Sequence, residues 1–320
     1  MIASLFRGFW TALKNPKLVL LLWAWNLLLG LAALMPARAW LSGVLNTATE
    51  TESLLTRFSF GAFADTLKYN DVNPFSLVIA SLVGLGFVAL AGNAFMNGGL
   101  VESIGSPSDS RTFMHRFFRG GGHFFWRFFR LALLAGVTGA ITVGIVATAA
   151  GVMTSPLGDS EWEPASLFWS FVTLAISGLV ALLFVLALDY ARIRVVRDGS
   201  RGMLRVFVES LAFVLRHAVA TYGIALVYLA LVGIVLLAYV AHEASWTTAT
   251  WAAILVLIGV QQVLMLARSG LRVMQVGAEW AYFEATVPPV VAPAPAPRVE
   301  SVTPPAVTTA ATPSATPDAG

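Results

Sequence analysis

The chain has 320 residues, of which 58% are hydrophobic and only 12% are charged. Soluble globular proteins carry roughly 25% charged residues, so this composition argues against a soluble domain and indicates a membrane protein. The net charge of +3 is too small to indicate a nucleic-acid partner, and the lack of Cys excludes disulfides, thiolate metal sites and cysteine nucleophiles.

Six apolar runs are long enough to cross a bilayer, because a helix of about 20 residues spans a hydrocarbon core of roughly 30 Å. The runs are apolar on all sides and do not alternate, which favours helices over a β-barrel. We therefore predict an all-α, polytopic membrane protein with six transmembrane helices arranged as three hairpins. The predicted spans are Leu18–Met35, Phe75–Met96, Leu131–Met153, Leu167–Leu188, Ala218–Ala241 and Trp246–Leu266.

The first run could instead be a secretory signal, because Lys14 and Lys17 precede it and Ala37-Arg38-Ala39 resembles a cleavage site. Its apolar stretch is longer than the usual stretch of about 7–15 residues, and a helix-like segment comes before it. We interpret it as a spanning helix. Asn15-Pro16 and Asn73-Pro74 place a capping side chain before a proline, which predicts that the first two spans begin there.

An amphipathic segment precedes the first, third and fifth spans. In the third of these segments, Arg201, Arg205 and Glu209 recur every four residues, while the large apolar residues lie elsewhere around the helix. This pattern is typical of an interfacial helix with a basic rim. It also indicates a threefold internal repeat, with coincidental hairpin spacing as the alternative. The three predicted interfacial helices are Leu5–Lys17, Phe113–Arg130 and Met203–His217.

The basic residues are distributed unevenly about the spans. All of the 20 Lys and Arg residues except Arg38, Arg57 and Lys68 lie in segments that six crossings place on one side. The positive-inside rule then predicts a bacterial inner (plasma) membrane protein with both termini in the cytoplasm. In the long outer loop, Leu54–Leu67 could form a short helix lying on the outer surface.

Residues 1–286 are predicted to form the transmembrane domain and residues 287–320 a cytoplasmic tail. Nine of the 15 prolines fall in this last segment, together with Ala, Thr and Val. Such a composition cannot bury an apolar core and predicts a disordered, extended tail.

Three hairpins with interfacial helices, and Asp189-Tyr190-Ala191-Arg192 at the end of the fourth span, resemble uncharacterised bacterial six-helix inner-membrane families. The layout is also similar to the membrane domain found ahead of some glycerophosphodiester phosphodiesterase catalytic domains. The resemblance covers about Leu5 to Glu284, and no such catalytic domain follows. It therefore implies a membrane location and no enzymatic activity.

Six polar side chains fall within or near the predicted spans. They could line the path of a transported substrate, or they could form hydrogen bonds between helices, which is the interpretation we favour. For the one acidic residue, Asp189, a proton or cation site is the alternative to an ion pair with Arg192 one turn away. These intramembrane polar candidates are Asn26, Asn93, Asn97, Asp189, Gln261 and Gln262.

The basic residues of the amphipathic segments are candidates for anionic lipid headgroups, each contributing about 1 kcal/mol near the surface. An ordinary positive-inside loop is the alternative. Gly120-Gly121-Gly122 lacks the Lys-Ser/Thr pair of a phosphate loop, and we expect a flexible joint between two helices there. The candidate lipid contacts are Arg116, Arg119, Arg127, Arg130, Arg201 and Arg205.

The sequence offers no catalytic, cofactor or metal motif: its four His residues are scattered, and there is no G-x-S-x-G. The expected partners are membrane lipids with anionic headgroups, and the small residues Gly136, Ala140 and Gly144 could pack within the bundle, against a second copy or against another membrane protein. We favour a non-enzymatic membrane protein that organises lipids or partner proteins. The alternatives are a subunit of a transporter or channel and a lipid-modifying enzyme.

Overall fold

The structure, a computed structural model, describes residues 1–47, 74–105, 112–158, 163–244 and 251–288. Every regular element within these ranges is an α-helix. The chain divides into two compact units, Met1–Pro288 and Pro289–Gly320, and the described residues all belong to the first. The expected outer helix Leu54–Leu67 lies outside the described residues, as does the expected tail apart from its first two positions.

The predicted fold class is confirmed, because six of the described helices are long and apolar enough to cross a membrane. Each predicted hairpin is formed by two helices in contact: α2 with α5, α6 with α7, and α9 with α10. The six helices are α2 (Pro16–Thr47), α5 (Pro74–Gly105), α6 (Phe113–Gly158), α7 (Glu163–Asp198), α9 (Ala218–Ala244) and α10 (Trp251–Thr286).

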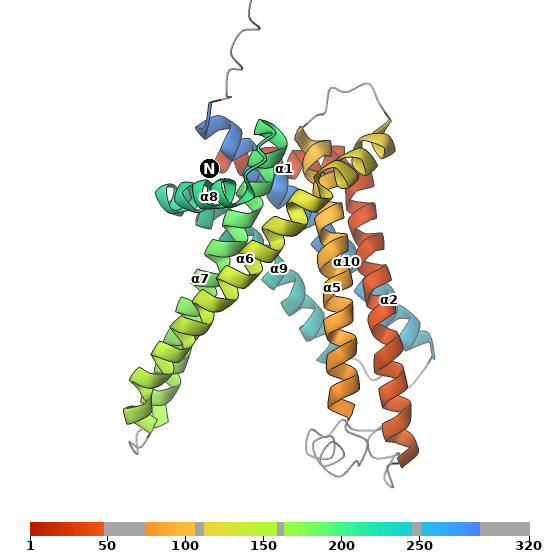
Figure 1. Ribbon diagram of the computed structural model, residues 1–320. Helices are drawn as coiled ribbons and strands as arrows, with labels where there is room; N and C mark the ends of the chain where they lie inside the picture. The colour runs from red at the N-terminus through yellow and green to blue at the C-terminus, as the bar shows by residue number, and fades with distance from the viewer. Residues whose placement is uncertain (48–73, 106–111, 159–162, 245–250, 289–320) are drawn as a thin grey trace, which may run out of the picture. The chain divides into compact units, whose positions relative to one another are not determined.

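Two shorter helices, α1 (Ile2–Lys14) and α8 (Met203–Arg216), lie at one end of the first unit. The last turns of α7 and α10 and the first turns of α6 reach the same end (Figure 1). Because most of the Arg residues of the described ranges lie in these segments, we call this end the basic end. It holds all three segments that the sequence predicts to be interfacial.

Prolines mark several helix starts as predicted: Pro16 and Pro74 open α2 and α5. The Asn15 side chain binds the preceding helix, since its Nδ2 donates to the Thr11 carbonyl of α1 at 2.9 Å. Helix α2 continues well past the predicted end of the first span, and both Pro36 and the Ala37–Ala39 segment lie inside it.

The three consecutive glycines do not form a joint between two helices, contrary to the expectation. Helix α6 is continuous from Phe113 to Gly158, so the basic segment and the third span form one helix. A Cβ on Gly120 would lie 2.5 Å from the Cβ of Glu102 in α5, and one on Gly121 would lie 2.8 Å from the Phe95 ring. The glycines therefore allow α5 and α6 to approach closely.

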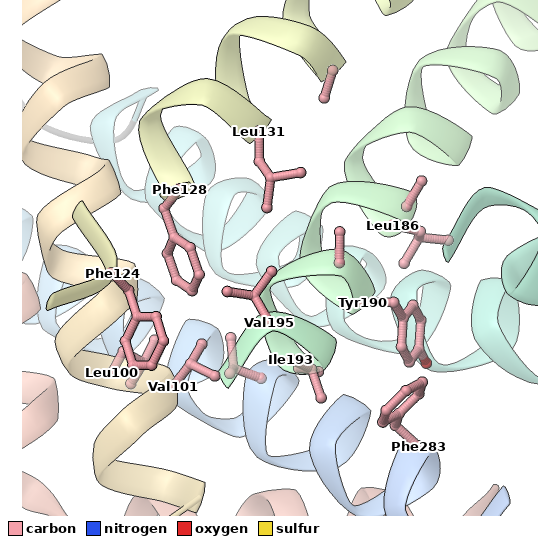
Figure 2. Packing of buried hydrophobic residues seen from close by; sticks show 14 of the residues in the cluster. Leu100, Val101, Phe124, Phe128, Leu131, Leu186, Tyr190, Ile193, Val195 and Phe283 are labelled. Atoms are coloured by element: carbon pink, nitrogen blue, oxygen red, sulfur yellow. The ribbon is translucent and has the colours of Figure 1, made fainter. Parts of the chain in front are cut away.

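The buried apolar core lies towards the basic end (Figure 2). Phe128 and Leu131 of α6, Tyr190 of α7 and Phe283 of α10 are all essentially inaccessible. Within the six spans only 6% to 22% of each apolar window is buried, and large aliphatic side chains such as Leu237 point outward. Outward-facing aliphatic side chains along the spans suit a bilayer, in which lipid surrounds the helices.

Candidate functional site

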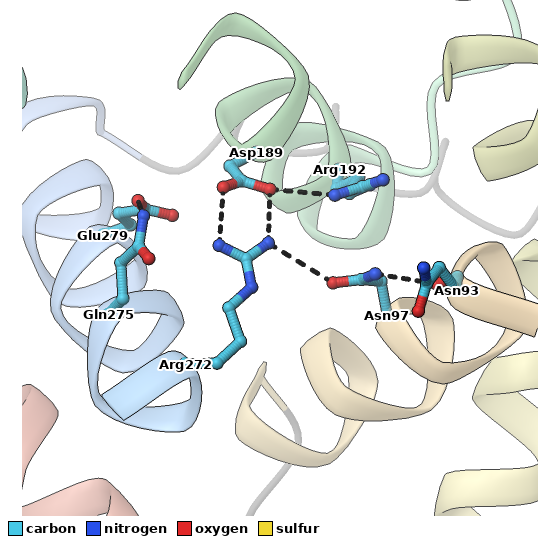
Figure 3. A network of polar contacts seen from close by, with 7 residues as sticks. All are labelled: Asn93, Asn97, Asp189, Arg192, Arg272, Gln275 and Glu279. Carbon is cyan, nitrogen blue, oxygen red and sulfur yellow. Dashed lines mark hydrogen bonds and ion pairs between the residues drawn. The ribbon is translucent and has the colours of Figure 1, made fainter. Parts of the chain in front are cut away.

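Asp189, near the end of α7, lies at the centre of a charged cluster at the basic end (Figure 3). Its carboxylate is 4% exposed and accepts a hydrogen bond from Arg192 Nη1 at 2.8 Å. Arg272 of α10 binds both carboxylate oxygens, with Nη1 2.8 Å from Oδ2 and Nη2 2.7 Å from Oδ1. This two-pronged geometry is the strongest form of ion pair between side chains, and it ties α7 to α10.

The cluster extends through amides to α5 and α2. Asn97 Oδ1 lies 3.5 Å from Arg272 Nη2, and Asn97 Nδ2 donates to the Asn93 carbonyl at 2.7 Å. The side-chain oxygen of Asn93 accepts a hydrogen bond from Trp25 Nε1 of α2 at 3.1 Å. Four helices of the bundle are thus joined through one polar network.

Glu279 lies farther along α10, on the other side of Asp189 from the amides (Figure 3). Its side chain is fully buried, and Gln275 Nε2 donates to its Oε1 at 2.8 Å. Its Oε2 has no hydrogen-bond partner in the described ranges of the chain. Glu279 therefore adds a second buried carboxyl group to the basic end.

A groove of about 680 Å³ runs down from this cluster between α2, α5, α6, α7 and α10. At the basic end its walls carry Arg192, Arg268 and Arg272 together with Asn97. Farther along, the walls are apolar, with Gly136 to Val143 of α6 on one side and Ala181 of α7 on the other. From Ala181 to Arg192 the groove extends about 16 Å along α7, at 1.5 Å per residue. It is therefore amphiphilic along its length.

The polar end of the groove carries an excess of positive charge. Arg192 is about nine-tenths buried, and its Nε is buried without a hydrogen-bond partner in the part of the chain that the structure describes. Arg268 is exposed and forms no ion pair with any described carboxylate. Asp189 is the only carboxylate that pairs with Arg192 or Arg272 within the described ranges. The groove therefore suits an anionic group better than a cation.

The intramembrane polar candidates separate into two sets. Asn26, Asn93 and Asn97 line the groove, and Asp189 lies at its head. Gln261 and Gln262 lie elsewhere on α10: Gln261 Nε2 donates to the Tyr239 hydroxyl at 3.0 Å, and Gln262 Oε1 accepts from Trp23 Nε1 at 3.2 Å. The bonds of these two glutamines join helices, as the packing interpretation predicts.

For Asn26 and Asp189, spacing along one helix accounts for some of the observed contacts and misses others. Asn26 Nδ2 donates to the Leu22 carbonyl of its own helix at 2.9 Å, although the residue lines the groove. Asp189 does pair with Arg192 one turn away, as the sequence predicts. Its stronger partner, Arg272, was not among the candidate residues. The sequence feature that could have identified Arg272 is its spacing of four residues from Arg268 at the end of an apolar run.

The basic candidates of α6 take different positions. Arg119 Nη2 lies 2.8 Å from Glu102 Oε1 of α5. Arg127 and Arg130 lie over aromatic rings of their own helix, 5.8 Å from the Phe124 ring centroid and 5.0 Å from that of Trp126. Arg116 lines a second pocket at the basic end, described below.

Arg201, just before α8, and Arg205 of α8 are both exposed at the basic end. Arg205 Nε donates to Glu209 Oε1 at 2.7 Å, and Glu209 also pairs with Arg194 of α7. The hydrogen bond from Arg205 lowers the pKa of the Glu209 carboxyl. Glu209 thus connects α8 to the basic end of α7.

Six helices that are long and apolar enough to cross a membrane, joined through one polar cluster, fit a multi-pass integral membrane protein. Among the described residues, no group of three or more His, Asp or Glu side chains is placed to hold a metal ion. Comparison with protein-family models, with curated proteins and with solved structures finds no match for this chain.

Proposed function

We propose that the protein is a non-enzymatic membrane protein that holds one anionic lipid in the groove, with the headgroup at Arg192, Arg268 and Arg272 and an acyl chain along the apolar wall. The observation that carries this proposal is the combination of a cationic end and apolar walls in one cavity of about 680 Å³. We place the protein in the bacterial inner membrane with both termini in the cytoplasm, because the basic residues lie at one end.

The selectivity of such a site comes from the headgroup. Lipid chains are as apolar as Leu side chains, so moving a chain from the bilayer into the groove changes little free energy. A hydrogen bond to a charged group contributes about 1.5–3 kcal/mol, and Arg192 Nε and Arg268 have no such bond in the described ranges. An anionic headgroup would supply the missing partner through its phosphate. A choline headgroup carries the same phosphate but adds a quaternary ammonium, which the neighbouring arginines repel.

The absence of enzymatic activity is part of the proposal, and the chemistry of the groove supports it. The polar side-chain groups of the described residues that line the groove are guanidinium groups, amides, the Trp25 indole N–H and one hydroxyl, that of Ser269. Arginine stays protonated and an amide is neither a base nor a nucleophile at neutral pH. The Ser269 Oγ donates a hydrogen bond to the Met265 carbonyl at 2.9 Å, and the described lining residues include no Asp, Glu or His. Such a set binds and orients a ligand.

A transporter subunit is the second candidate, favoured by the convergence of Asn26, Asn93 and Asn97 on one groove. It predicts solute flux in proteoliposomes that depends on these amides. The lipid-binding proposal predicts no solute flux above that of protein-free liposomes.

Lipid retention tests the proposal. The full chain is purified in mild detergent from membranes containing phosphatidylglycerol, and bound lipid is identified by native mass spectrometry. We expect the wild type to retain an anionic lipid and Arg268→Gln to retain several-fold less, because one charge-assisted bond is lost. Arg268 forms no ion pair in the described ranges, so its replacement leaves no described carboxylate unpaired.

Arg216→Gln is the matched control, because Arg216 is exposed at the same end, lies outside the groove and is not among the candidate lipid contacts. Its lipid retention should equal that of the wild type. Equal retention by the wild type and Arg268→Gln, or equal retention of anionic and choline lipids, would contradict the proposal.

A further inference from the structure

A second pocket of about 410 Å³ lies at the basic end, between α1, α5, α6 and α10. It does not share a lining residue with the groove. Arg7 and Lys14 line it from α1, Arg116 from α6, Ser103 from α5, and Trp280 and Glu284 from α10. Its polar lining thus comes from four separate elements.

The charges around this pocket favour an anion. Among the described residues, three basic side chains line it, with one carboxylate, that of the exposed Glu284. Lys14 Nζ lies 5.6 Å from the Trp10 ring centroid, a cation–π contact that places the ammonium group beside the pocket. The described lining therefore carries more basic than acidic side chains.

Ser103 adds a neutral hydrogen-bond donor. The residue is 6% exposed, and its Oγ is buried without a hydrogen-bond partner in the described part of the chain. A hydroxyl that is buried without a partner costs about 1–3 kcal/mol, and a ligand oxygen would remove that cost. Cationic groups together with a hydroxyl donor match the several acceptor oxygens of a phosphate.

Close contacts between α1, α5 and α10 fix the walls of the pocket. A Cβ on Gly105 would lie 2.5 Å from the Trp280 ring, and one on Gly277 would lie 3.0 Å from the Cβ of Thr11. All four of these residues line the pocket. Because these helices already touch, the backbones that carry the donor side chains are in place before any ligand binds, which lowers the entropic cost of binding.

We propose that Arg7, Lys14 and Arg116, with the Ser103 hydroxyl, form a binding site for a phosphate monoester, separate from the lipid groove. The same chemistry is present in the headgroup of phosphatidic acid and in a free phosphate from the aqueous phase. The site does not depend on the function proposed for the groove.

Binding to the full chain in detergent is measured with two ligands: inorganic phosphate as the soluble source, and short-chain phosphatidic acid as the lipid source. The test variants are the double variant Arg7→Gln/Lys14→Gln and Ser103→Ala. The control is Lys17→Gln/Arg216→Gln, which likewise removes one Lys and one Arg from the basic end but outside the pocket. Circular dichroism and gel filtration verify that each variant is folded. Ser103→Ala keeps the charge of the protein and places a better helix former in α5.

We expect the double variant to weaken binding at least about tenfold and Ser103→Ala about threefold or more, with the control and Arg268→Gln unchanged. Binding of inorganic phosphate identifies a soluble ligand, and binding of phosphatidic acid alone identifies a lipid. Equal binding by the wild type and both test variants, or an equal loss in the control, would overturn the proposal.

Discussion

Gly8 of α1 and Gly277 of α10 lie in direct contact, with the Gly8 Cα 3.2 Å from the position that a Cβ would take on Gly277. The buried face of α1 consists of small residues, Ser4, Gly8 and Ala12, whereas large apolar residues such as Phe6 remain exposed. Helix α1 therefore docks on α10 through its backbone and directs its large side chains away from the bundle. This is the arrangement of small residues that lets helices approach closely in membranes.

Gly8→Ile should dislodge α1, because a Cβ at this position would lie 2.3 Å from the Met274 carbonyl oxygen, which belongs to a helix and cannot move aside. We expect a loss of about 1–3 kcal/mol in the free energy of unfolding, measured by thermal or denaturant unfolding in detergent. Gly30→Ile is the control, since nothing lies within 4 Å of its Cβ position. Equal stability of the two variants would show that α1 is not docked in this way.

Asp189→Asn should destabilise the protein by about 3–5 kcal/mol, because it leaves two guanidinium groups without their buried counterion. The further change Arg272→Gln should recover part of this loss, since it removes one of the two unpaired cations. A double-mutant cycle in unfolding experiments measures the coupling. Strictly additive losses would mean that the bond between Asp189 and Arg272 is absent.

Gly92 allows the Trp25 ring to lie against α5, where its Nε1 reaches Asn93. A Cβ on Gly92 would lie 1.9 Å from this ring, so Gly92→Ala must displace it and should cost about 1–3 kcal/mol. Asn93→Leu removes only the hydrogen bond and should cost about 0.6–1.7 kcal/mol. Unfolding experiments on both variants check that Gly92→Ala loses more stability than Asn93→Leu. A larger loss for Asn93→Leu would mean that the hydrogen bond dominates the contact between α2 and α5.

The contact between α8 and α7 should weaken in acid. Because the folded pKa of Glu209 is lowered, its contribution to stability is present above the unfolded pKa and is lost as the pH falls through the folded pKa. Hydrogen exchange in α8, corrected for the intrinsic rate, should therefore be faster in acid than at pH 7. In the Glu209→Gln variant, the α8 amides should exchange as fast at pH 7 as they do in acid. A wild-type α8 equally protected in acid would contradict the role of Glu209.

Hydropathy predicted the six spans because a helix in lipid must satisfy its backbone internally and present apolar side chains. Hydropathy located the helix ends less well, because it detects only the apolar part of a helix that crosses the hydrocarbon core. Helix α5 continues beyond Met96 to Gly105, and α2 continues through Pro36 although proline removes one backbone donor from the helix. The glycines of α6 likewise act through contacts with α5, which no local pattern reveals.

The site was predictable only where spacing is local. Asp189 and Arg192 are three residues apart on one helix, and their pair follows from helix geometry. Arg272 is 83 residues from Asp189, and Trp25 is 68 residues from Asn93, so both contacts depend on how the hairpins assemble. The groove exists only after five helices have come together, so the sequence alone does not show that its arginines form a group.

The central claim is that the basic end, with the groove head and the second pocket, faces the cytoplasm. The chain contains no Cys, so single cysteines at Ser200 and Ser53 can be labelled in intact cells with a membrane-impermeant maleimide without background. We predict labelling of Ser53→Cys in intact cells and of Ser200→Cys only after the membrane is opened. Labelling of Ser200→Cys from outside intact cells would contradict the account.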